Sequence, residues 1–150
     1  MDAWPEIHGG TNYADLAAHY LKAHGLNEAE VLAVPAPASA QDRTFLSAVM
    51  VRKWGERRKI TLGAFDVFSS GAHARRSRIL YRMAFGPEVR IGVLSARPKE
   101  YDPRYWWRTS VGVKTIIGES ISLVYTKCCF HPGSSGSREE MWAVAEHADR

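Results

Sequence analysis

The sequence contains little of what would define a disulfide framework, a structural zinc site or a membrane span. Its only cysteines are the adjacent Cys128 and Cys129. Neighbouring cysteines do not easily form an unstrained disulfide, and no C-x-x-C spacing occurs, so we expect neither a disulfide framework nor a zinc site. The longest apolar run falls far short of the roughly 20 residues that a membrane helix needs, and the first residues do not have the pattern of a signal peptide. The chain as written is therefore expected to be soluble, and cytoplasmic by default.

A large excess of charge of one sign is also missing. The chain has 20 Lys and Arg residues against 16 Asp and Glu residues, which gives a formal net charge of +4. Arg75, Arg78 and Arg82 would form a basic stripe, but the net charge is small and no recognised motif is present, so we expect no nucleic-acid partner. The histidines are scattered without the spacing of metal ligands, and we predict no metal site.

What the chain does have is the composition of a globular domain, with 45% hydrophobic and 24% charged residues over 150 positions. Its apolar spacing alternates between helical and strand periods, so we predict one α/β domain over residues 1–130. A flexible Gly/Ser linker and short tail are expected over residues 131–150. The predicted elements are a helix over 13–23, a strand over 31–34, a helix from Asp42 to Gly55, a strand over 64–68, a helix after Gly71, a strand over 89–94 and a helix over 111–127.

Strands that alternate with helices predict a mostly parallel sheet with helices on both faces, which is a Rossmann-like three-layer fold. In such folds, ligands bind outside the carboxyl ends of the strands. That rule selects three polar stretches of this chain, residues 35–44, 69–76 and 95–104. The last predicted helix is expected to bury one row of side chains. Its members are Val113, Ile116, Ile117, Ser120, Ile121 and Val124.

The stretch from Ser69 to Arg76 is the strongest candidate for a ligand site. Gly71 allows a tight turn between the strand and the helix, and the first turn of a helix presents unpaired backbone N–H groups that suit a phosphate or carboxylate. His73 lies in that first turn, and Arg76 lies one turn further on the same side. Arginine adds a planar fork for bidentate contacts with an anion. His73 and Arg76 are therefore the candidates for catalysis, although no catalytic role is assigned.

The same residues allow other interpretations. In the simplest, Ser70 merely caps the helix, His73 is a surface residue and the arginines are solvated. Ser69 and His73 form a conceivable nucleophile–base pair, but their spacing across a strand–helix turn does not guarantee hydrogen-bond reach. Glu119 lies in an otherwise apolar helix, either as a buried partner for an arginine such as Arg76 or as a catalytic acid.

The order Ser70-x-x-His73-x-x-Arg76 after a strand resembles the central motif of the SanA/YdcF/ElyC-like proteins, a bacterial family of largely unknown biochemistry. Further matches follow in the same order and cover roughly residues 8 to 127. They are His8-Gly9-Gly10, the helix over 13–26, Thr44, Trp107 and Gly118-Glu119.

Two departures from the family pattern affect what the resemblance implies. The family usually has Ser-x-Asn-Thr-x-Glu-Asn, of which only Thr44 is present here, so a role that depends on that Glu or Asn does not transfer directly, although Asp42 or Arg43 could substitute. The family also begins with a strand, a glycine-rich turn and a helix before its Gly-Gly. This chain begins almost at Gly9-Gly10, so we expect an N-terminally truncated form of the fold.

The resemblance implies a protein of bacterial cell-envelope biogenesis that binds a nucleotide-like or phosphorylated ligand. It implies S-adenosylmethionine as a cofactor of some members, and membrane association only through a segment absent from this chain. The alternative is a transferase or hydrolase acting on a lipid-linked phosphate precursor, with His73 as acid or base and Arg76 holding the anion. In either case the partner is a small-molecule or lipid-linked anion. The predicted ligand-binding residues are Gly9, Gly10, Thr44, Ser69, Ser70, His73 and Arg76.

Overall fold

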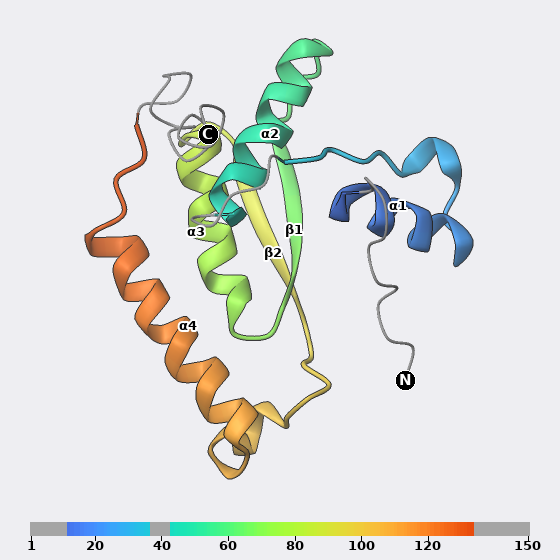
Figure 1. The fold of residues 1–150 in the computed structure, drawn as a ribbon. Helices are drawn as coiled ribbons and strands as arrows, with labels where there is room; N and C mark the ends of the chain where they lie inside the picture. The colour runs from blue at the N-terminus through green and yellow to red at the C-terminus, as the bar shows by residue number, and fades with distance from the viewer. Residues whose placement is uncertain (1–11, 37–42, 134–150) are drawn as a thin grey trace, which may run out of the picture.

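The structure is a computed structural model, and it describes residues 12–36 and 43–133 (Figure 1). These residues form a mixed α/β arrangement, as the sequence predicts. Its elements are α1 (Tyr13–Ala23), η1 (Glu28–Glu30), α2 (Arg43–Arg57), β1 (Ala64–Ser70), α3 (His73–Phe85), β2 (Arg90–Ala96), η2 (Pro103–Arg108) and α4 (Ser110–Cys128), where η marks a 3₁₀ helix.

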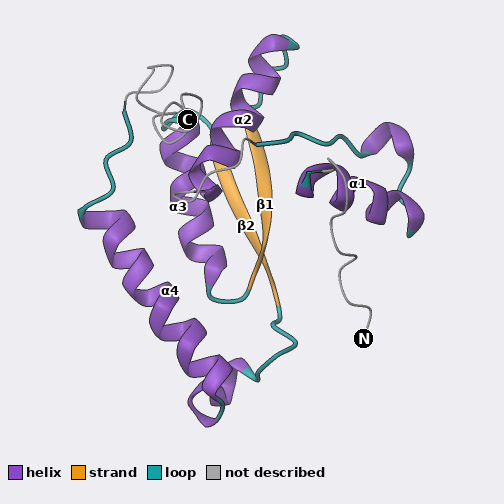
Figure 2. Ribbon diagram, in the orientation of Figure 1, coloured by secondary structure: helices purple, strands orange, loops and turns teal. Residues whose placement is uncertain are grey.

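Strands β1 and β2 form a parallel pair, and α3 connects them (Figure 2). The register runs from Ala64 opposite Arg90 to Ser70 opposite Ala96. Because parallel neighbours need a long crossover, a helix between two such strands is the expected connection. The carboxyl ends of both strands therefore lie together, where α3 begins.

Helix α3 is the centre of the packing, since it contacts both strands as well as α2 and α4. Its buried side carries residues spaced three and four apart, as an amphipathic helix requires. Those residues are Ala74, Ser77, Leu80 and Ala84. The core forms where this side meets α2, and its buried members are Phe45, Ala48, Val49, Leu80, Ala84 and Phe130. Burial of a side chain such as Leu80 stabilises the fold by about 1.5–3 kcal/mol.

Only one face of the two-stranded sheet is covered within the described residues. Phe65 points towards α3, where its ring lies 4.9 Å from that of Phe85. On the opposite face, Phe68 is 75% exposed and Leu94 is 56% exposed. Helix α1 buries none of its residues and is set off from the sheet (Figure 1). The sequence analysis predicted a three-layer fold with helices on both faces of the sheet. In the described part of the chain, helices cover one face only.

The prediction of a strand over residues 31–34 is wrong. Val31 has extended backbone angles, but neither it nor the three residues that follow pair with β1 or β2. The run is short, and Pro35 ends it with a residue that has no N–H group to donate to a ladder. Apolar character alone therefore produced an extended segment and not a strand.

Helix α2 also departs from its predicted end, because it continues through Gly55 to Arg57. The backbone N–H of Ile60 donates to the carbonyl of Gly55 at 2.9 Å, so the following turn folds back over this glycine. A Cβ atom at position 55 would lie 3.3 Å from the Ile60 carbonyl oxygen. The glycine is therefore explained by a close approach of the backbone and not by the end of the helix.

Helix α4 has the predicted position but not the predicted buried side. Gly112 and Thr126 are its buried residues, whereas Ile121 is 65% exposed and Val124 is 63% exposed. Gly112, Glu119 and Thr126 are spaced seven residues apart and therefore lie on one stripe of the helix. Glu119 faces α3 from this stripe, and the apolar row consequently lies on the other side.

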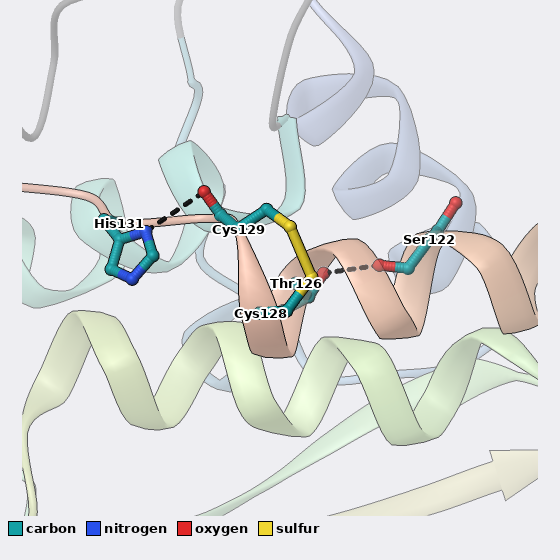
Figure 3. Close-up of a disulfide and its surroundings, with 5 residues drawn as sticks. All are labelled: Ser122, Thr126, Cys128, Cys129 and His131. Carbon is teal, nitrogen blue, oxygen red and sulfur yellow. Dashed lines mark hydrogen bonds between the residues drawn. A yellow bond between two sulfur atoms is a disulfide. The ribbon is translucent and has the colours of Figure 1, made fainter.

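The end of α4 carries a disulfide between the adjacent residues Cys128 and Cys129, a pairing that the sequence analysis regarded as difficult to form (Figure 3). Cys129 has left the helical conformation, with φ of −128° and ψ of −20°. The pair joins adjacent residues and closes no chain loop, so it adds little of the entropic stabilisation that a long-range bridge provides. Just before it, Thr126 Oγ1 donates to the Ser122 carbonyl at 2.8 Å.

Candidate functional site

Four side chains from three helices meet near the carboxyl end of β1. His73 Nδ1 lies 3.0 Å from Glu119 Oε1, and His73 Nε2 lies 3.4 Å from Thr44 Oγ1. Arg76 Nε donates to Glu119 Oε2 at 3.0 Å. Thr44 lies 29 positions before His73 in the sequence, and Glu119 lies 46 positions after it. The imidazole ring of His73 therefore connects two distant parts of the chain. We refer to Thr44, His73, Arg76 and Glu119 as the imidazole cluster.

The turn between β1 and α3 places His73 and Arg76. Gly71 has φ of +45°, a left-handed conformation that a residue with a side chain adopts only at a cost. Its N–H donates to the Ala96 carbonyl at 2.9 Å, and the Ser95 hydroxyl donates to its carbonyl at 3.1 Å. The turn is thus held to the end of β2, and α3 starts in a fixed direction. His73 and Arg76 then share one side of its first turn.

Glu119 holds Arg76 in a partly buried ion pair. The side chains of Arg76 and Glu119 are 19% and 21% exposed, and Arg76 NH2 makes a second, longer contact of 3.4 Å with Glu119 Oε1. Burial acts to raise the pKa of Glu119, but hydrogen bonds from Arg76 and His73 outweigh burial, so its pKa lies below the ordinary value of 4.5. Glu119 is therefore a carboxylate at neutral pH, as a partner of Arg76 and not as a proton donor.

The Nδ1 atom of His73 has two neighbours that demand opposite roles. It lies 3.0 Å from Glu119 Oε1, an acceptor, and 2.9 Å from Arg76 NH2, a donor. A neutral imidazole carries one N–H, so Nδ1 either donates to the carboxylate or accepts from the guanidinium. In the first case Nε2 presents a lone pair to the Thr44 hydroxyl, and in the second it presents a proton. Either way, His73 connects the hydroxyl with the charged pair.

The other predicted residues of the stretch lie away from this cluster. Ser69 Oγ is 3.2 Å from Ser77 Oγ, so the hydroxyl beside the His73 ring is that of Thr44 and not that of Ser69. Ser70 is exposed, and α3 begins at an N-cap, Ala72, without any side-chain cap bond. Gly9 and Gly10 lie outside the described residues, and so does most of the predicted linker and tail.

Sequence reasoning did not single out Ser77 or Tyr101, which support the turn. Ser77 is buried and donates to the His73 carbonyl at 3.1 Å. Tyr101 is buried, and its hydroxyl would lie 3.4 Å from a Cβ atom at Gly71. The position of Ser77, four residues after His73 in a helix, is a sequence signal for the first of these contacts. No local pattern marks Tyr101.

Two hollows bear on where a ligand can lie. One of about 380 Å³ lies at the carboxyl ends of the strands, and Gly71, Ala72, Ser95 and Tyr101 are among its lining residues. A larger one of about 590 Å³ lies at the amino ends of the same strands and is bordered by Arg78 and Arg82. The smaller hollow is the relevant one, because the carboxyl ends are where open α/β sheets bind ligands and where the polar side chains converge.

Within the described residues there is no group of three or more His, Cys, Asp or Glu side chains that could hold a metal ion. None of the helices in this part of the chain combines the length and apolar character that crossing a membrane requires.

Comparisons with known proteins found no matching family model, no matching curated protein and no matching solved structure.

Proposed function

We propose that the imidazole cluster, together with the hollow at the carboxyl ends of the strands, binds a nucleotide-like or phosphorylated ligand. The observation that carries this proposal is the meeting of two helix starts at one point. Thr44 lies in the first turn of α2, His73 lies in the first turn of α3, and their side chains are in contact. The first turn of each helix has backbone N–H groups without helical partners and a partial positive charge. Together they favour an anion with several oxygen atoms.

Arg76 supplies the charged contact for such an anion. Its Nε and NH2 atoms are engaged by Glu119, whereas NH1 has no hydrogen bond to another residue in the described ranges. The ion pair fixes the guanidinium plane before a ligand arrives, which lowers the entropic cost of binding. His73, 32% exposed at its side chain, is accessible from solvent beside it.

The likeness of Ser70-x-x-His73-x-x-Arg76 to the SanA/YdcF/ElyC-like motif supports the same ligand class. On this proposal the chain is a SanA/YdcF/ElyC-like protein of bacterial cell-envelope biogenesis, with a Rossmann-like fold, and its ligand is a phosphorylated or lipid-linked precursor. S-adenosylmethionine is the cofactor to test first, because the resemblance implies it for some members.

Binding is tested by thermal shift with ADP, S-adenosylmethionine and a polyprenyl phosphate, followed by calorimetry on any probe that raises Tm. A ligand at 100 times its Kd stabilises the folded state by about 2.7 kcal/mol, which is a readily measured shift. His73→Gln is expected to weaken binding of the phosphorylated probe about tenfold or more. Arg75→Gln is the matched control, since Arg75 is exposed and next to the cluster in sequence but not part of it.

Two results would overturn the proposal. One is that no phosphorylated probe raises the Tm of the wild-type protein. The other is that His73→Gln and Arg75→Gln bind the probe equally well.

A transferase or hydrolase acting on a lipid-linked phosphate is the second candidate, and one specific observation favours it. His73 lies between a carboxylate and a hydroxyl, at 3.0 Å from Glu119 and 3.4 Å from Thr44, which is the order of groups in a hydroxyl-activating relay. Turnover that is lost in His73→Gln, in a protein that still folds, would favour the enzyme over a binding module.

A further inference from the structure

The Thr44 hydroxyl has a different kind of contact from several other hydroxyls on the described helices. Four of those hydroxyls donate to the carbonyl four residues earlier in their own helix, which is the usual local bond of helical Ser and Thr. They are Ser47, Ser77, Ser120 and Thr126. Thr44 lies in the first turn of α2, where no such carbonyl of the helix precedes it, and its hydroxyl contacts the His73 ring instead.

From this contact we infer that Thr44 is a nucleophile that accepts a phosphoryl group, with His73 as its general base and Glu119 as the residue that positions the ring. The inference rests on the proposed function, because it requires a phosphorylated ligand in the same site. It deepens that function by naming the reacting atom and the class of reaction, phosphoryl transfer through a phosphothreonine intermediate.

A general base at this position requires the tautomer with the proton on Nδ1, which is one of the two that the contacts of His73 allow. With Nδ1–H donating to the Glu119 carboxylate at 3.0 Å, the lone pair of Nε2 faces the Thr44 hydroxyl at 3.4 Å. This is the tautomer in which the ring can take a proton from oxygen. A nucleophile, a base and an acidic residue that orients the base form the pattern by which hydroxyl nucleophiles are activated. Contacts of this kind are often longer before substrate binds.

The reaction balances in two steps. In the first, Thr44 Oγ1 bonds to phosphorus, and the bond from phosphorus to the alcohol oxygen breaks with its electron pair on that oxygen. The Thr44 proton passes to His73 Nε2 and then to the leaving alcohol. In the second step, water attacks the phosphothreonine, His73 takes the proton of that water and returns it to Thr44 Oγ1, and inorganic phosphate leaves. Arg76 and the N–H groups of the two first turns face the phosphoryl oxygens, where negative charge lies throughout.

The test uses the whole chain with p-nitrophenyl phosphate and with a polyprenyl phosphate as phosphoryl donors. Each sample is quenched in acid, its intact mass is measured, and the modified peptide is located by fragmentation. The wild-type protein is expected to gain one phosphoryl group on Thr44. Thr44→Ser keeps a hydroxyl and is expected to be modified as well. Thr44→Val has nearly the same shape and is expected to lose the adduct and at least 100-fold of any turnover.

Two further variants separate the roles of the neighbours. His73→Gln is expected to slow adduct formation by about 100- to 10,000-fold, the usual contribution of a general base. Glu119→Gln is expected to lower kcat more than it raises KM, and Glu119→Asp to restore part of kcat, which loss of fold alone would not do. Ser47→Ala is the control, since its hydroxyl lies one turn along α2 and bonds within its own helix.

An adduct on Thr44 that disappears in Thr44→Val and persists in Ser47→Ala supports the inference. If the wild-type protein binds a phosphorylated probe but carries no adduct with either donor, or carries it on another residue, Thr44 is not the nucleophile and the binding function stands. If no phosphorylated probe binds at all, the proposed function and this inference fail together.

Discussion

Replacing Glu119 with glutamine is the sharpest test of how the imidazole cluster is held together. The substitution keeps the shape of the side chain but removes its charge, so Arg76 and His73 both lose a carboxylate acceptor. Exposed ion pairs contribute about 0.2–1 kcal/mol, whereas removal of one partner from a fully buried pair costs about 3–5 kcal/mol. The side chains here are 19% and 21% exposed, and we therefore expect an intermediate loss of about 2 kcal/mol in the free energy of unfolding at pH 7.

The same variant predicts a specific dependence on pH. The pKa of Glu119 lies below 4.5 in the folded protein, so its ionised form is the one that folding favours. The stabilisation is therefore fully present above the unfolded pKa and is lost as pH falls through the lower, folded value. The difference in stability between wild type and Glu119→Gln should shrink as the pH falls through the folded pKa of Glu119.

Urea unfolding followed by tryptophan fluorescence at a series of pH values measures both effects. Glu88→Gln is the control, because Glu88 is exposed and forms no ion pair with another described residue. The reasoning is refuted if the two variants are equally stable at pH 7. It is refuted as well if the deficit of Glu119→Gln does not diminish in acid.

Three further predictions concern stability and are checked by the same unfolding measurement. Gly118→Ala lies in the middle of α4 with open space around it, so the free energy of unfolding should rise by about 0.5–1 kcal/mol. Gly112→Ala on the same helix should be less stable than wild type, because its Cβ would collide with the Trp106 carbonyl and Thr109. Gly71→Ala should cost about 1–2 kcal/mol, because position 71 has φ of +45°, and equal stability of the variant would contradict that account of the turn. Leu80→Ala should cost about 2–5 kcal/mol, since its side chain is buried in the core, and a loss below 1 kcal/mol would show that the core is misassigned.

The part of the fold that the sequence predicted well is the unit of β1, α3 and β2. Its strands are apolar runs ended by turn residues, and α3 is marked by Gly71 before it. These signals are local, so they can be identified without knowing what the segment packs against. The ion pair between Arg76 and Glu119 was one of the two predicted roles for Glu119. It follows from the rule that a carboxylate in an apolar helix needs a partner.

The parts that the sequence predicted badly depend on contacts between distant segments. The buried side of α4 was assigned by counting apolar residues, but Glu119 must face α3 to reach Arg76, and that polar contact sets the rotation of the helix. Residues 31–34 have the composition of a strand, yet pairing requires a neighbour with free ladder positions in the right place. Thr44 was expected near the site from its place at the end of the polar stretch 35–44 and from family likeness, but nothing in its local sequence indicates that it contacts His73.

The distribution of the imidazole cluster along the chain has a consequence for its dynamics. Thr44 precedes the β1–α3–β2 unit and Glu119 follows it, so the unit can be intact while the cluster is open. Separation of the part of α4 around Glu119 would release Arg76 and free the ring of His73, while Phe130, beyond the end of α4, still packs against Phe45 in the core. Amide hydrogen exchange should then show α4 opening at a lower free energy than α3. If the cluster binds a ligand as proposed, its affinity would depend on the fraction of molecules in which α4 is docked, and any condition that holds α4 in place would strengthen binding without contacting the ligand.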